Sequence, residues 1–386
     1  MSLDLTSGLL GTVLVVAAVA LPVLSLGLWS RVRGHRLLRQ GQRWGLVVVS
    51  QLVAVVAVLV LINDYFGLYS SWDDLLGRTS SDAVAGAIDP TSTGPGAHTA
   101  PGTARTSPSA GGQVFAAQVP WSGGLPAGFS AYTEPRSYLA MVKVPGSVQP
   151  LRLYVSLPPQ YFDPAFAHKA FPVVELFHGY PGTPTTWYHA LAVLPRLEQA
   201  MASGATPFVL VVPQISVPGG PDLECTNLPG QPQLATFLTD GVREVVTSHF
   251  RVRADQAGWG LMGYSEGGYC AAQLLLRHPD LFAAGVSISG YDAPESSFFD
   301  GYPAQRAAGS LTHLLAARPA VALRASASVQ DPQSSGSLAG LKRSVRPPTV
   351  LTAVQYSQGG HNTSDWSNEL PADFRWLTQR LAPIAG

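Results

Sequence analysis

The segment Gly263–Gly268 reads Gly-Tyr-Ser-Glu-Gly-Gly and contains the pattern G-x-S-x-G around Ser265. The apolar run Ala257–Met262 precedes it, and a helix-forming run that ends before Pro279 follows it. This succession predicts a strand, a tight turn and a helix, an arrangement that exposes a serine hydroxyl as a nucleophile. An ordinary glycine-rich turn is the alternative, because the short pattern also arises by chance in a chain with 39 glycines.

A serine hydroxyl is a poor nucleophile until a neighbouring base takes its proton. His361 directly follows the last apolar run of the chain, in the segment Gly-Gly-His-Asn, where a base would reach the serine. His278 and His313 fall in helical stretches, and several other histidines precede the serine, which is the wrong chain order for such a base. A histidine on a surface loop is the alternative interpretation of His361.

Two aspartates could orient this histidine. Asp292 follows the first apolar run after the serine, and Asp331 follows the second. The chain order serine, acid, histidine, with the acid after the second strand, favours Asp331 and leaves Asp292 as the alternative.

Acyl chemistry at a serine also requires two backbone N–H groups that stabilise an oxyanion. The amide of Glu266 is expected to be one, because it follows the serine at a helix N-terminus, where the helix dipole favours negative charge. The other is expected in the segment His-Gly-Tyr-Pro-Gly after an earlier strand. Pro181 has no N–H, so Tyr180 or Gly182 must supply it, and Tyr180 is favoured.

The elements that must position these residues alternate along the chain. Two early strands are expected at Ser137–Val144 and Leu151–Leu157, and a helix at Thr236–Phe250. Short, continuously apolar runs that alternate with helices predict an α/β fold with a mostly parallel sheet covered on both faces. Ligands bind such sheets at the carboxyl ends of the strands. The six apolar runs are Pro172–Phe177, Phe208–Val212, Ala257–Met262, Ala283–Ser289, Val321–Ser328 and Thr349–Tyr356.

Two further apolar runs, Leu9–Trp29 and Trp44–Ile62, are each about 20 residues long, enough for a helix to cross a membrane. Neither run has the polar face of a core helix. A cleaved signal peptide needs basic residues before its apolar run, whereas Asp4 is the only charge there. Five arginines separate the runs, so we expect this loop in the cytoplasm and the later chain outside it. The arginines are Arg31, Arg33, Arg36, Arg39 and Arg43.

Composition suggests three parts. Residues 1–78 would form a two-helix membrane anchor, and residues 119–386 the catalytic domain. The intervening residues 79–118 are rich in Ser, Thr, Gly, Pro and Ala, and we expect a disordered linker there.

Charge and motif content exclude several classes. The 24 basic and 24 acidic residues balance, so no basic field recruits nucleic acid. No H-E-x-x-H run and no zinc-type Cys/His spacing occurs, so neither a metal nor an organic cofactor is expected. No obligate protein partner is inferred. Cys225 and Cys270 could form a disulfide outside the cytoplasm, or remain two buried thiols.

Three segments together resemble the putative esterase family of α/β-hydrolases, which includes esterase D and the antigen 85 mycolyltransferases. They are HGYPG after a strand, GYSEGGYCAAQLLLRHPDLF, and a late GGH before a helix that contains tryptophan. The resemblance covers about Ser137 to Leu381. It implies the α/β-hydrolase fold, the triad Ser265, Asp331 and His361, and the oxyanion donors Tyr180 and Glu266. The chain departs from the mycolyltransferases at His178, where they carry an aspartate.

The resulting hypothesis is a membrane-anchored, extracytoplasmic serine esterase that acts through an acyl-enzyme. Its partners would be the lipid bilayer and an ester or acyl-lipid substrate. One alternative is an acyltransferase that moves an acyl group to a glycan or lipid of the cell envelope. The other is a catalytically silent module that binds the envelope.

Overall fold

The computed structural model describes residues 8–29, 35–66 and 125–386, and the chain divides into two compact units, Met1–Ser80 and Ser81–Gly386. The linker expected at residues 79–118 lies outside the described residues. The three-part division therefore stays a prediction.

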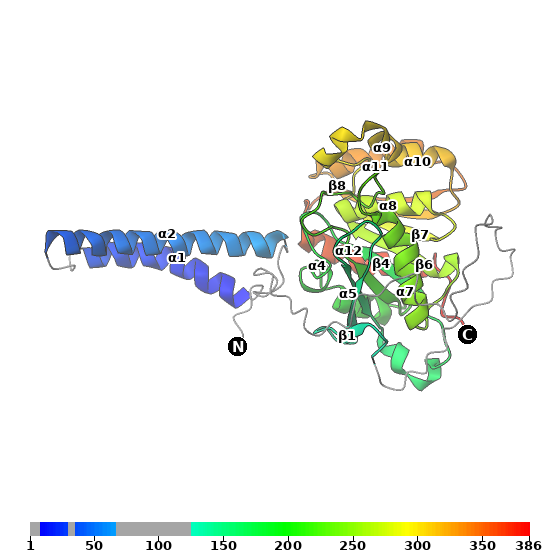
Figure 1. Cartoon of the computed structure of the whole chain (residues 1–386), viewed down its shortest axis with the longest axis horizontal. Helices are drawn as coiled ribbons and strands as arrows, with labels where there is room; N and C mark the ends of the chain where they lie inside the picture. Colours follow the sequence, from blue (N-terminus) through cyan, green and yellow to red (C-terminus); the bar gives the residue numbers. More distant parts are fainter. Residues whose placement is uncertain (1–7, 30–34, 67–124) are drawn as a thin grey trace. The chain divides into compact units, whose positions relative to one another are not determined.

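The first unit contains two long helices, α1 (Gly8–Trp29) and α2 (Arg36–Phe66), which lie side by side (Figure 1). The Ser25 and Ser50 hydroxyls form a buried hydrogen bond between them, with 3.2 Å between the oxygens. By length and composition, Leu10–Trp29 and Arg39–Ile62 could each cross a membrane, with mean hydropathies of 2.3 and 2.9. Few of their residues are buried, so these helices expose mainly apolar side chains.

The backbone of residues 125–386 forms a nine-stranded sheet in the order β1-β2-β3-β5-β4-β6-β7-β8-β9. The first three strands run antiparallel to their neighbours, and β4 to β9 pair in parallel. The expected mostly parallel sheet is thereby confirmed. The strands are β1 (Phe129–Ala131), β2 (Ser137–Val142), β3 (Leu151–Ser156), β4 (Val173–Phe177), β5 (Val209–Pro213), β6 (Trp259–Tyr264), β7 (Ala284–Ile288), β8 (Ala322–Ser328) and β9 (Val350–Tyr356).

Helices cover both faces of the sheet (Figure 1). Buried side chains of α5 (Val193–Ala202) and α12 (Thr363–Thr378) pack in the apolar cluster on one face. Those of α7 (Val242–His249), α8 (Glu266–Arg277) and α11 (Pro332–Ser344) pack in the cluster on the other. Shorter helices are α4 (Thr186–His189), α6 (Leu234–Thr236), α9 (Pro303–Ala308) and α10 (Leu311–Leu314), with 3-10 turns η3 (Pro159–Phe162), η4 (Pro164–Phe166), η6 (Gln256–Gly258), η7 (Ser297–Gly301) and η8 (Leu315–Ala317).

The helix expected at Thr236–Phe250 is not a uniform α-helix. It begins within α6, widens to the π-helix η5 (Phe237–Gly241) and continues as α7. The five residues of η5 are too few to establish a separate period, so the apolar pattern predicts a helix but does not locate the wider segment.

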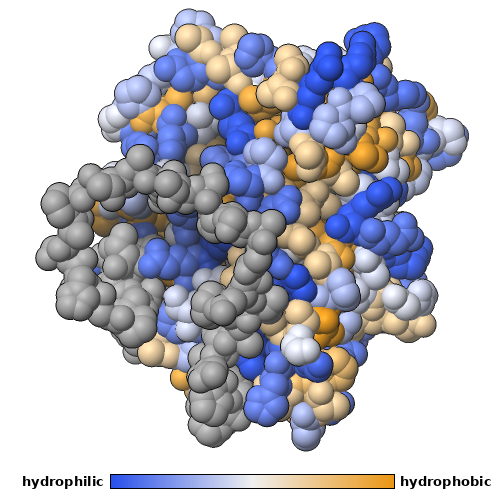
Figure 2. Space-filling model, turned by 90° about the vertical axis from the view of Figure 1, so that its right-hand side faces the viewer, coloured by the Kyte–Doolittle hydropathy of each residue, from blue (hydrophilic) through white to orange (hydrophobic). Residues whose placement is uncertain are grey.

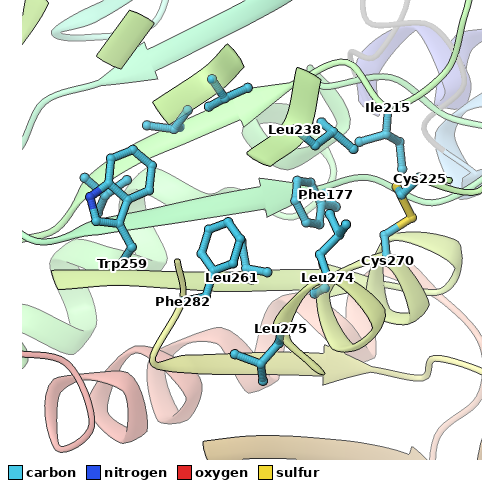
Figure 3. Packing of buried hydrophobic residues seen from close by; sticks show 14 of the residues in the cluster. Phe177, Ile215, Cys225, Leu238, Trp259, Leu261, Cys270, Leu274, Leu275 and Phe282 are labelled. Carbon is cyan, nitrogen blue, oxygen red and sulfur yellow. A yellow bond between two sulfur atoms is a disulfide. The ribbon is translucent and has the colours of Figure 1, made fainter. Parts of the chain in front are cut away.

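The core beside α8 contains large side chains from the central strands, among them Phe177, Trp259 and Leu261 (Figure 3). At one end of this cluster, a disulfide joins Cys225 to Cys270, whose Cα atoms are 5.6 Å apart. Both cysteines are fully buried. The bond ties the loop after β5 to the second turn of α8.

The surface of the larger unit differs from that of the two N-terminal helices. On the face in Figure 2, hydrophilic and hydrophobic residues form small, intermixed groups. Exposed apolar side chains are instead concentrated on α1 and α2, for example Leu26 and Leu52, which are 75% and 60% exposed.

Candidate active site

Ser265 occupies the turn between β6 and α8, at the carboxyl end of a central strand. Its backbone has a positive φ, which is unusual for a residue with a side chain, with φ 55° and ψ −124°. Such a conformation costs on the order of 1–3 kcal/mol for a residue with a side chain. The turn is held by the Ser265 N–H, which donates to the Ile288 carbonyl at 2.8 Å. The serine side chain is thereby presented at the edge of the sheet where the loops converge.

Two glycines make this turn possible because backbone passes very close to them. A Cβ atom on Gly263 would lie 1.9 Å from the Gly267 carbonyl oxygen, and one on Gly267 would lie 2.1 Å from the Phe177 oxygen. Both contacts are with backbone atoms, which cannot move aside as a flexible side chain would. The glycines of the G-x-S-x-G pattern therefore let the first turn of α8 pack against β4.

The three residues expected to form a triad meet at this edge. His361 Nε2 lies 2.9 Å from Ser265 Oγ, and His361 Nδ1 lies 2.8 Å from Asp331 Oδ2. A carboxylate that accepts from Nδ1–H leaves the Nε2 lone pair free to accept the serine proton. Loops after β6, β8 and β9 supply the three side chains, so the hydrogen-bonded relay passes over the end of β7, which lies between β6 and β8 in the sheet.

Asp331 is fixed by the helix that follows it. It is the N-cap of α11, and its carboxylate accepts hydrogen bonds from the Ser334 N–H at 3.4 Å and the Ser334 hydroxyl at 2.6 Å. Burial raises the pKa of Asp331, but the hydrogen bonds from Ser334 and His361 outweigh it, and the pKa lies below its usual value. The carboxylate is therefore ionised at neutral pH. Ser334 was not identified from the sequence, although Asp-Pro-x-Ser is a typical helix start.

The alternative acid, Asp292, has other partners. Its carboxylate accepts from the Ser310 hydroxyl at 2.7 Å and from the Thr312 N–H at 2.9 Å. These bonds hold the start of α10. The geometry thus assigns Asp331, rather than Asp292, to the histidine.

The loop that carries His361 is held by Asp365, which was not predicted as a site residue from the sequence. The Asp365 carboxylate accepts from the Gly360 N–H and from the Asn362 side-chain amide, both at 2.7 Å. The Trp366 ring packs at 90° to the imidazole, with 4.8 Å between ring centroids. The imidazole plane is therefore fixed from its own loop as well as by Asp331.

Both expected oxyanion residues, Tyr180 and Glu266, line a cavity together with Ser265. Glu266 is the first residue of α8, so its N–H has no partner within the helix. The turn that contains Tyr180 lies against the serine turn, because a Cβ on Gly179 would be only 3.2 Å from the Ser265 Cβ. Gly182 is not among the described residues that line this cavity, which favours Tyr180 of the two alternatives.

His178 stabilises the turn that contains Tyr180. It is buried, and its Nδ1 lies 2.8 Å from the Gly179 carbonyl oxygen. Its Nε2 accepts the Ile215 N–H at 3.3 Å. Burial lowers the pKa of His178 to about 4, so the ring is neutral at pH 7. At the position where the mycolyltransferases carry an aspartate, this chain thus has a neutral histidine that connects the ends of β4 and β5.

The cavity at Ser265 and His361 has a volume of about 780 Å³. One side of it carries four carboxyl groups, here called the acidic side: Asp222, Glu224, Glu266 and Glu295. Sequence reasoning identified only the backbone of Glu266. The other three lie on loops distant in sequence, and only the fold brings them to the nucleophile.

Comparison with known proteins decides the family. Residues 148–377 match the protein family described as "Putative esterase". The chain belongs to this esterase family. It is therefore a serine hydrolase, as the sequence predicted.

Relatives and solved structures agree with the family. An uncharacterized protein of Corynebacterium glutamicum is 26% identical over 246 residues, which are 59% of this chain and 57% of that protein. An S-formylglutathione hydrolase from Agrobacterium tumefaciens has a similar structure, with a TM-score of 0.55 and 16% identity over 67% of this chain and all of the other. A ferulic acid esterase has a TM-score of 0.53 and 19% identity, over 63% of this chain and 97% of the other. At these identities the structures show the fold, and the expected α/β-hydrolase fold is confirmed.

Proposed function

We propose that the protein is a membrane-anchored serine esterase that works through an acyl-enzyme, with Ser265 as the nucleophile. The observation that carries this proposal is the continuous hydrogen-bonded relay from Ser265 through His361 to the ionised Asp331. A serine hydroxyl in such a relay is activated by general base catalysis.

In the proposed first step, His361 Nε2 takes the Ser265 proton while Oγ attacks the ester carbonyl carbon. The carbonyl oxygen becomes an oxyanion, which the amides of Tyr180 and Glu266 stabilise. Asp331 stabilises the imidazolium that forms. The tetrahedral intermediate then expels the alcohol, which takes the proton from His361, and an ester of Ser265 remains.

In the second step, a water molecule gives a proton to His361 and attacks the acyl-enzyme carbonyl. Collapse of the second intermediate releases the carboxylic acid and returns the proton to Ser265. An acceptor hydroxyl in place of water would make the protein an acyltransferase. The two activities share the acyl-enzyme and differ only in what attacks it.

The proposed membrane anchor consists of helices α1 and α2. Both helices have the length and the exposed apolar surface of membrane spans. The Ser25–Ser50 contact is of the kind that joins helices within a bilayer. The arginine-rich loop between them favours a cytoplasmic position for that loop. The catalytic unit would then face the extracytoplasmic side.

The acyl-enzyme is tested with purified full-length protein in detergent. Rapid mixing with 4-nitrophenyl acetate should give a burst of nitrophenol equal to the enzyme concentration, and mass spectrometry should find the acetyl group on Ser265. The Ser265→Ala variant should give neither signal. Turnover without a burst, with no trapped acetyl group, would contradict rate-limiting breakdown of an acyl-enzyme, and turnover that survives Ser265→Ala would remove the nucleophile. Product analysis with and without an added alcohol distinguishes hydrolysis from transfer.

A further inference from the structure

The acidic side of the cavity lies beside the point where the proposed reaction builds negative charge. Glu266 directly follows the nucleophile, and its amide is a proposed oxyanion donor. Among the described residues that line the cavity, none is a lysine or an arginine. Carboxylates at this place oppose the developing oxyanion. Where these groups are ionised, a positive charge beside them would offset this effect.

Several hydrogen bonds hold Glu224 in place on the acidic side. It is buried, and its carboxylate accepts hydrogen bonds from the Tyr291 hydroxyl at 2.8 Å and the Glu295 N–H at 2.7 Å, and also from the Ser296 N–H. The neighbouring Cys225 is held by the disulfide to α8. Burial raises the pKa of Glu224 to about 7. Glu224 thus fixes the loop that carries Glu295 at the mouth of the cavity.

Asp222 and Glu266 form a second acidic unit, because their side chains are hydrogen-bonded to each other. Two carboxyl groups in direct contact share a proton, since both cannot be ionised at low cost. Burial and the nearby Asp222 and Glu224 carboxylates raise the pKa of Glu266 well above its usual range. Ionisation of both Asp222 and Glu266 is therefore unfavourable by itself. A cation bound beside them would stabilise their ionised forms.

The compensating charge is best supplied by the substrate. Within the described part of the chain, no group of three or more His, Cys, Asp or Glu side chains is arranged to hold a metal ion. The same cavity also presents aromatic rings, including Phe298 and Tyr180, which is 58% exposed. Carboxylates combined with aromatic faces are the surroundings that favour an ammonium group.

We infer that the acidic side selects esters that carry an ammonium group within a few atoms of the scissile carbonyl. This inference rests on the proposed esterase function and adds a substrate class to it. The four carboxyl groups belong to the cavity of the nucleophile rather than to a separate site. Anionic esters are disfavoured by the same charges.

The test compares esters that differ only in charge, with full-length protein in detergent at about pH 6.5, where an α-amino group is protonated. Ethyl esters of alanine, lactate and isobutyrate place an ammonium, a hydroxyl or a methyl group at one position of the acyl part. Acetylcholine and 3,3-dimethylbutyl acetate differ in the same way in the alcohol part. Each kcat/KM is divided by the rate of hydroxide hydrolysis of that ester, which removes intrinsic reactivity.

We expect the cationic member of at least one series to be preferred by about tenfold or more, the discrimination of one partly buried ion pair. In the double variant Asp222→Asn, Glu295→Gln, the ratio of kcat/KM for the cationic ester to that for its neutral partner should fall by about tenfold. The matched control Glu198→Gln removes an exposed carboxylate on α5 and should keep the preference. The absence of a preference in both series, or a preference that survives the double variant, would overturn the inference.

Failure of the proposed function is a separate outcome. If the wild type hydrolyses none of these esters, the esterase proposal fails for them, and charge selection is decided by equilibrium binding. Calorimetric titration should then detect choline but not 3,3-dimethylbutanol, and the double variant should lose the choline signal. Equal binding of the two compounds, or no binding of choline, would overturn the inference by itself.

Discussion

Reduction of the Cys225–Cys270 bond should destabilise the larger unit without changing any other covalent bond. The two cysteines are separated by 45 residues. For a closed loop of that length, the chain-entropy relation gives a loss of about 4 kcal/mol in the free energy of unfolding. For a domain of this size, that loss corresponds to a fall of roughly 8–16 °C in Tm.

The assay is thermal and denaturant unfolding of the full-length protein, followed by tryptophan fluorescence, with and without a phosphine reductant. Alkylation and mass spectrometry establish that the reduction is complete. The double variant Cys225→Ala, Cys270→Ala is the control, because it contains no other cysteine and should not respond to the reductant. A shift below about 1 kcal/mol in fully reduced protein would refute the loop-closure reasoning. An equal response of the control would show that the reductant acts elsewhere.

Three further predictions concern the relay, the turn and the anchor. Asp331→Asn should lower kcat by about 10⁴-fold because the amide favours the wrong imidazole tautomer, whereas Asp292→Asn should cost far less; steady-state kinetics that rank them in reverse would reassign the acid. Gly267→Ala should prevent folding or abolish activity, because its Cβ would meet a strand carbonyl at 2.1 Å; circular dichroism and an ester assay check this, and a folded, fully active variant would contradict the packing. A reporter active only outside the cytoplasm should work when fused after Gly386 and fail near Gly41; activity at Gly41 would invert the topology.

The fold was predictable because its strongest signals are local. The runs around β4 to β8 are mostly apolar and almost fully buried because helices cover both faces of the sheet there, and each run became a strand within a few residues of its expected ends. β1 (Phe129–Ala131) was missed because three residues give no usable periodicity. The π-helical segment Phe237–Gly241 was missed for the same reason, since five residues are too few to show a different period.

The site was predictable only in part. Ser265, Asp331 and His361 could be named because each lies in the loop that follows a strand, and the order of the strands in the chain restricts which loops can meet. Glu224 and Glu295 could not, because their roles depend on the path of two loops, and no pattern in sequence indicates that path. Adjacency to Cys225 was the one signal that could have drawn attention to Glu224.

The central claim is that Ser265 is an activated nucleophile, and covalent labelling tests it most directly. Full-length protein is treated with a fluorophosphonate probe, digested, and mapped by mass spectrometry. We predict one modified peptide, with the probe on Ser265, and labelling that disappears in Ser265→Ala and slows strongly in His361→Ala. Labelling that persists in folded Ser265→Ala, or that resides on another residue of the wild type, would contradict the account.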